Sequence, residues 1–116
     1  MFDFEKLEVY QRIRALNKKL IPYVFTLGNS DSNLKDQLSR AGLSVLLNLS
    51  EGTGRMSDAD KKQFYIRARS SVFECVSILQ TLLDLSKIEK ELYEHLYNEY
   101  EGISKMLLGM IRSLKN

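Results

Sequence analysis

Apolar side chains recur along this chain at spacings of three or four residues, which places them on one face of a helix. The pattern is clearest in the last segment, whose apolar positions are Leu96, Tyr100, Ile103, Leu107, Met110 and Leu114. The preceding segment repeats it at Phe64, Ala68, Ser71, Cys75, Ile78 and Leu82. Two earlier segments follow the same rule, at Leu34, Leu38, Ala41, Val45 and Asn48, and at Leu7, Tyr10, Ile13, Leu16 and Leu20. Four helices are therefore expected, over residues 4–27, 31–51, 57–85 and 87–114.

Polar residues indicate where these helices begin. Ser57 is the expected N-cap of the third helix, and the two aspartates of its first turn suit the positive end of the helix dipole. The Ser-x-x-Glu spacing of Ser86 and Glu89 predicts a capping box at the start of the fourth helix. Pro22 is expected to bend the first helix or to split off its last turn.

The length of 116 residues is typical of one domain, so residues 1–116 are expected to share one core. One proline and six glycines leave few breaks, which favours long helices over many short strands. Four long helices with short connections predict an all-α fold, an up-down-up-down four-helix bundle.

The second helix is apolar in nearly every direction between Ala41 and Leu49. A helix of a monomeric bundle keeps one face in water, so this one is expected to bury its outer face against another subunit. The residues expected in that contact are Leu43, Leu46 and Leu47. The alternative is a hydrophobic helix that its own neighbours shield.

The sequence NLSEGTGR, residues 48–55, raises the question of a phosphate-binding loop. The P-loop pattern is absent, and Asp58 and Asp60 place negative charge where a phosphate would bind. Gly52 is expected to adopt the left-handed conformation that ends a helix, and Gly54 to permit a second tight step. The stretch is therefore interpreted first as a helix stop.

The polar residues around these glycines need partners. Glu51 ends a helix, where its charge meets the negative end of the dipole, and Asn48 occupies a position that the apolar spacing assigns to the core. Arg55 is the nearest partner for Glu51, and Asn48 is expected to bond the carbonyls at the helix end. The sequence thus predicts a polar clasp that fixes the angle between two helices or two subunits, formed by Asn48, Glu51, Gly52, Gly54 and Arg55.

The segment SRAGLSVLLNLSEGTGR also resembles the region around the Asn-x-x-Glu-Gly-x-Gly-Arg signature of the bacterial 23S ribosomal RNA intervening-sequence proteins. FEKLEVYQR, residues 4–12, is similar to the opening of that family, and the third helix matches its pattern at Phe64, Ala68, Ser71 and Glu74. The resemblance implies a four-helix bundle that assembles into a ring, a homopentamer, without enzymatic activity. A distant relative of that family is the accessory protein of diversity-generating retroelements, a pentameric ring with a basic surface that binds nucleic acid and a reverse transcriptase.

Few residues in the chain suit catalysis. With His95 as the single histidine, the chain has too few ligands for a typical metal cluster and little basis for a Ser-His-Asp arrangement. Cys75 belongs to the apolar face of the third helix, where it is expected to be buried. We therefore expect no enzyme, no catalytic residue, no metal and no cofactor. One cysteine, no secretory leader and no long apolar run predict a cytoplasmic protein without a membrane span.

The net charge of +2 is small, but the positive residues are unevenly distributed. The first and third helices carry the candidate phosphate contacts, which are Arg12, Arg14, Lys18, Lys19, Lys61, Lys62, Arg67 and Arg69. A ring would repeat such a patch into a broad basic surface, which favours RNA or DNA as the partner. The alternatives are an ordinary solvated face, and a protein-binding scaffold that makes no contact with nucleic acid.

Overall fold

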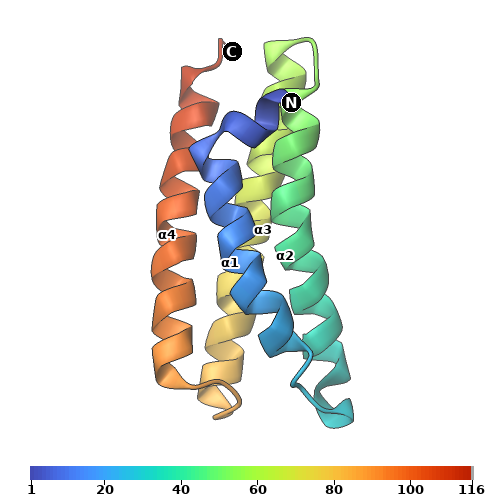
Figure 1. Ribbon diagram of the computed structural model, residues 1–116, viewed down its shortest axis with the longest axis vertical. Helices are drawn as coiled ribbons and strands as arrows, with labels where there is room; N and C mark the ends of the chain where they lie inside the picture. The colour runs from blue at the N-terminus through green and yellow to red at the C-terminus, as the bar shows by residue number, and fades with distance from the viewer. Residues whose placement is uncertain (116) are drawn as a thin grey trace.

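The computed structural model describes residues 1–115, and its four long helices run antiparallel to their sequence neighbours (Figure 1). A short 3-10 helix η1 (Asp3–Lys6) leads into α1 (Glu8–Val24), and a second one, η2 (Asn29–Asp31), precedes α2 (Ser32–Thr53). The chain then forms α3 (Asp58–Asp84) and α4 (Lys90–Ser113). The expected all-α, up-down-up-down four-helix bundle is confirmed.

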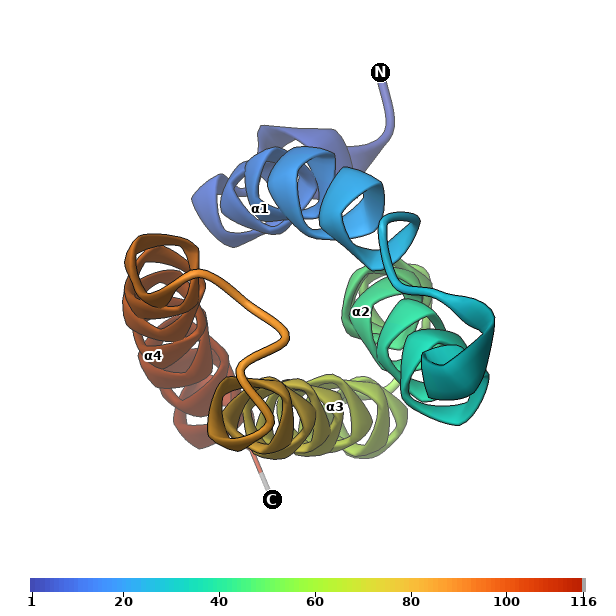
Figure 2. The same cartoon turned by 90° about the horizontal axis from the view of Figure 1, so that it is seen from below.

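Seen along its axis, the bundle places the helices around a square in chain order (Figure 2). Each helix packs on the two beside it, so α1 and α3 lie across a diagonal, as do α2 and α4. Residues of the predicted apolar faces fill the space between them, with Leu16, Leu38, Leu82 and Leu107 at most 2% exposed. The core therefore follows from the spacing of apolar residues in each helix.

The helix starts agree with the sequence only in part. The Ser57 hydroxyl accepts a hydrogen bond from the backbone N–H of Asp60, so the expected N-cap of α3 is confirmed. The predicted capping box at Ser86 is wrong, because Ser86 has a positive φ of 57° in the turn and α4 begins only at Lys90. α1 also begins later than expected, after η1, and continues through Pro22 without a break.

Gly52 does not end α2. No glycine in residues 1–115 has a positive φ, and α2 continues to Thr53 before Gly54, in right-handed helical conformation, caps it. A Cβ atom on Gly52 would lie 2.7 Å from a ring carbon of Tyr65 and 2.9 Å from the Cβ of Phe64. Gly52 therefore permits the close approach of α3 to α2, which corrects its predicted role as a left-handed helix stop.

The length and hydropathy of the helices decide whether any of them could cross a bilayer. Within residues 1–115, none combines the length and the hydropathy that crossing a bilayer requires.

Candidate nucleic-acid interface

Three of the basic residues predicted to contact nucleic acid are exposed on α1, with Lys19 about a quarter-turn round the helix from Lys18. Arg14 and Lys18 are one turn apart, and Lys19 follows directly; all three side chains are exposed. Among the residues that the structure describes, no carboxylate comes within 4.0 Å of their nitrogen atoms. Their charges are therefore available to an anion in solution.

The sequence around this group strengthens its positive field. No aspartate or glutamate occurs between Glu8 and Asp31, so α1 carries no negative charge after its first residue. The Arg14 guanidinium lies 6.0 Å from the centre of the Tyr10 ring, which in turn packs on Phe4 with ring centres 4.8 Å apart. Aromatic and cationic groups thus adjoin on one side of the bundle, and both groups contact single-stranded nucleic acids in proteins.

Arg12 lies elsewhere. Its Nη2 atom is 3.4 Å from Oε1 of Glu99, and its guanidinium packs directly on Gly102 of α4. A methyl group on Gly102 would lie 2.6 Å from Nη2, so the glycine makes room for the arginine. Arg12 therefore connects α1 to α4 instead of projecting freely into solvent.

The basic residues of α3 lie on the opposite side of the bundle from α1 (Figure 2). Lys61 and Lys62 are half-buried near the start of α3, and Arg67 is exposed. Arg69 is half-buried, and its Nε donates a hydrogen bond of 3.1 Å to the Ser104 hydroxyl of α4. Within one subunit, the residues of α1 and α3 therefore form two separate surfaces.

A cluster that the sequence did not reveal surrounds Phe64. The guanidinium carbon of Arg55 lies 4.5 Å from the centre of the Phe64 ring, and that of Arg67 lies 5.0 Å from it. The apolar spacing assigned Phe64 to the core seam, yet it is only half-buried and contacts two cations. The signal that could have located it is the i, i+3 spacing of Phe64 and Arg67, which brings these side chains together on a helix.

The predicted clasp exists in an altered form. The Asn48 side-chain amide donates to the Ser44 carbonyl at 2.9 Å and to the Ser44 hydroxyl oxygen at 2.8 Å, and the Ser71 hydroxyl of α3 donates to that same oxygen at 2.9 Å. Asn48 thus stabilises the contact of α2 with α3 through Ser44, and not by bonding carbonyls at the helix end. By contrast, Glu51 in the last turn of α2 and Arg55, just after the end of that helix, form a long ion pair of 4.0 Å between exposed side chains.

Comparison with known proteins identifies the family of this chain. The sequence profile described as "23S rRNA-intervening sequence protein" matches residues 5–109. The chain belongs to this family. None of the curated proteins matches it.

A crystal structure of a family relative shares the fold. It is a protein of unknown function from the S23 ribosomal protein family of Bacteroides thetaiotaomicron, with 24% sequence identity and a TM-score of 0.83. The similarity covers 89% of this chain and 97% of the relative. At this identity, the likeness supports the four-helix arrangement alone.

Two of the three leucines that were predicted for the outer face of α2 are exposed in this family member. Leu43 and Leu47 of α2 are 45% and 60% exposed, as predicted for an outer face. Leu46 is half-buried and packs against the core, which corrects its assignment to the outer face. The reason is geometric, because Leu46 lies a quarter-turn round the helix from Leu47.

Reactive groups are buried or isolated in this member of the family. Burial is the largest cause that raises the pKa of the Cys75 thiol to about 12, and nearby Glu74 adds to it. His95 is exposed. Within residues 1–115, no group of three or more acidic, histidine or cysteine side chains is placed to hold a metal ion.

Proposed function

We propose that this protein is a non-catalytic oligomer, assembled as a ring, that binds nucleic acid through the basic outer side of α1. The observation that carries this proposal is the exposed group of Arg14, Lys18 and Lys19, which has no carboxylate partner within residues 1–115. Cations that attract phosphates gain affinity by releasing the counterions around the nucleic acid. Three positive charges on one subunit bind weakly.

Assembly multiplies this weak affinity. A symmetric ring repeats the three cations of α1 in every subunit, and contacts made together through one assembly bind far more tightly than each contact alone. Leu43 and Leu47 support an assembly, because adjacent exposed leucines on a helix are typical of a surface that another protein covers. The family name refers to ribosomal RNA, so RNA is the first ligand to test.

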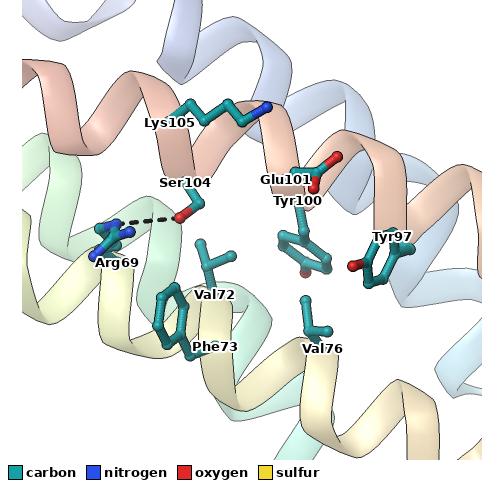
Figure 3. A pocket seen from close by; sticks show the side chains of 9 residues that line it. All are labelled: Arg69, Val72, Phe73, Val76, Tyr97, Tyr100, Glu101, Ser104 and Lys105. Carbon is teal, nitrogen blue, oxygen red and sulfur yellow. Dashed lines mark hydrogen bonds between the residues drawn. The ribbon is translucent and has the colours of Figure 1, made fainter.

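A second candidate function is a scaffold that binds a partner protein. The observation that favours it is Phe73, whose ring is 54% exposed at the edge of a groove between α3 and α4 (Figure 3). Exposed aromatic rings of this kind are enriched in protein interfaces. The two candidates differ in their dependence on salt, because an apolar contact is far less sensitive to ionic strength than a phosphate contact.

Fluorescence anisotropy with labelled single-stranded and duplex RNA and DNA tests the proposal across about 50 to 200 mM salt. Binding to duplex DNA should weaken with a log–log slope of about −0.9 for each phosphate that is contacted. The Arg14→Glu/Lys18→Glu variant should flatten this slope and retain the mass of the parental oligomer. The control is Lys90→Glu/Arg112→Glu, which makes the same charge change at exposed residues of α4.

The proposal is wrong if the parent binds none of the four nucleic acids at the lowest salt. It is also wrong if the α4 control loses as much affinity as the α1 variant, because net charge would then explain the effect. In the first case, the protein-scaffold function takes its place.

A further inference from the structure

The outer side of α3 carries a second helical seam in addition to the one in the core. Its members follow each other at spacings of 3, 4, 3, 4 and 3 residues, are all exposed, and are all uncharged: Gln63, Ile66, Ser70, Phe73, Ser77 and Gln80. We call this set the α3 outer stripe. A helix face in contact with water normally carries charged residues, and the alternation of three and four is the spacing with which helices pack on each other.

The α3 outer stripe borders two hollows, one on each side of Phe73. The larger, about 240 Å³, lies between α3 and α4, where Phe73 and Val76 face Tyr97 and Tyr100 (Figure 3). The smaller, about 90 Å³, is lined by Phe73, Ile66 and Ile111 among others. Arg69 lies beside both hollows, and its hydrogen bond to Ser104 fixes the position of its guanidinium. We call these two hollows together the α3–α4 groove.

The outer side of α2 has the complementary shape. Leu43 and Leu47 are one turn apart and project as two adjacent apolar side chains. Both leucines belong to α2, which does not line the groove and lies on another side of the bundle from α4 (Figure 2). Because the two surfaces do not overlap, a symmetric dimer that covers one of them leaves the other in water, whereas a head-to-tail arrangement covers both.

The two surfaces also lie at the same height along the bundle. The hydrogen bond between Ser44 and Ser71 sets the register of the antiparallel helices α2 and α3. From this pair, Leu43 is level with Val72, beside Phe73, and Leu47 is level with Ala68. Subunits of a closed ring are related by rotation without a rise along the axis. If that axis is parallel to the bundle, rotation alone brings the leucines of one copy to the groove of the next.

The charges around both surfaces favour the same orientation. On α2, Glu51 lies one turn beyond Leu47, towards the end of the bundle at which α3 begins, and Arg40 lies before Leu43. On the groove, Arg69 lies nearer that same end, and Glu101 lies one turn away from it. A neighbouring copy in parallel orientation therefore places Glu51 on the side of Arg69 and Arg40 on the side of Glu101.

We propose that Leu43 and Leu47 of one copy dock into the α3–α4 groove of the next copy, on both sides of Phe73. The occupant of the groove is a second copy of this chain, and the contact is head-to-tail. This inference rests on the assembly part of the proposed function and adds the surfaces that form it. Since the contact uses α2, α3 and α4, it leaves the outer side of α1 free in every subunit, with Arg14 and Lys18 accessible to nucleic acid.

Two single variants and their mixture test the contact. Leu47→Glu removes the projecting residue and keeps the groove, whereas Phe73→Glu closes the groove and keeps the leucines. Each variant alone should have the monomer mass of 13.4 kDa in native mass spectrometry. Mixed in equal amounts, they should form a heterodimer of twice that mass, because the leucines of one variant still fit the groove of the other. Both side chains are more than 50% exposed, and circular dichroism checks that both variants fold.

The control is Ala15→Glu, which adds the same charge at an exposed position of α1 and should retain the parental assembly. A monomeric parent would overturn the inference, as would a variant that keeps the parental mass or forms a homodimer. A mixture that stays monomeric would overturn it too. Nucleic-acid binding is measured separately, so a head-to-tail oligomer that binds none would contradict the proposed function and leave this contact in place.

Discussion

The guanidinium of Arg12, on α1, packs against Gly102 of α4. Because glycine has no side chain, the arginine occupies the space that a side chain at residue 102 would fill, and α1 and α4 approach each other at this point. The same guanidinium reaches Glu99, one turn away on α4, and lies 3.5 Å from the sulfur of Met106. Both members of the Arg12–Glu99 ion pair are about one-third exposed, so solvent screens their attraction. The fit to the glycine therefore matters as much as the charge.

Gly102→Ala should consequently raise the stability less than an alanine elsewhere in the same helix. Replacing glycine in an exposed helix interior gains about 1 kcal/mol, and Gly109 offers a clean control because nothing lies within 4 Å of its added Cβ. At Gly102, displacement of the Arg12 guanidinium offsets this gain. Urea unfolding should show Gly109→Ala stabilised by about 1 kcal/mol and Gly102→Ala close to the parent. Equal gains would contradict the contact.

Gly52→Ala should destabilise the bundle by about 1–3 kcal/mol, the usual result of forcing extra atoms into a packed contact. Its Cβ would meet the ring of Tyr65, which is 5% exposed and has no room to move. Gly54→Ala is the matched control, because its nearest neighbour would be 3.6 Å away and its φ of −87° suits any residue. Thermal or urea unfolding of the two variants measures the difference. If Gly52→Ala is as stable as the parent, α2 and α3 are less tightly packed at this glycine than the distances indicate.

The polar contacts of α2 should differ sharply in their contribution to stability. Asn48→Ala should reduce the free energy of unfolding by about 0.5–1.5 kcal/mol, because it removes two hydrogen bonds in a half-buried network. Glu51→Ala should change it by less than about 1 kcal/mol, since its ion pair with Arg55 is exposed. A double-mutant cycle with Ser71→Ala should show coupling for Asn48 and none for Glu51. Coupling between Glu51 and Ser71 would instead support the clasp predicted from the sequence, in which Glu51 takes part.

Stability should fall at alkaline pH. Burial raises the pKa of Tyr23 to about 12, from an ordinary value of 10, with a smaller effect of Asp31, and burial likewise raises the pKa of Cys75 to about 12 from 9.0. Well below pH 9 both groups keep their protons whether the chain is folded or unfolded, so their pKa shifts do not make stability depend on pH there. Between pH 9 and pH 12 the unfolded chain loses these protons first, so stability decreases as pH rises.

Thermal unfolding at a series of pH values checks this dependence. Tyr23→Phe should make the decline between pH 10 and pH 12 shallower, because phenylalanine has no proton to lose. At neutral pH the same variant should be slightly less stable, since the Tyr23 hydroxyl donates a 2.9 Å hydrogen bond to the Lys87 carbonyl. An identical decline in parent and variant would show that Tyr23 does not titrate abnormally.

The pattern of apolar residues was sufficient to predict the four helices and their order. Each helix presents its apolar residues every three or four positions, and burying these faces against each other leaves few alternatives to a bundle. The N-cap of α3 could also be predicted from the sequence, because the Ser57 hydroxyl accepts its hydrogen bond from a backbone N–H only three residues away. The exposed cations Arg14 and Lys18 followed from their spacing on one side of α1.

The partners of residues on different helices were decided by the tertiary structure alone. Gly52 and Arg12 were misplaced because the sequence does not state how closely two helices approach, and that distance determines whether a glycine ends a helix or accommodates a neighbour. The capping box at Ser86 failed because the turn from α3 to α4 places this residue at a positive φ. The separation of the basic residues of α1 from those of α3 follows from packing the helices around a square, a relation that no spacing within one helix contains.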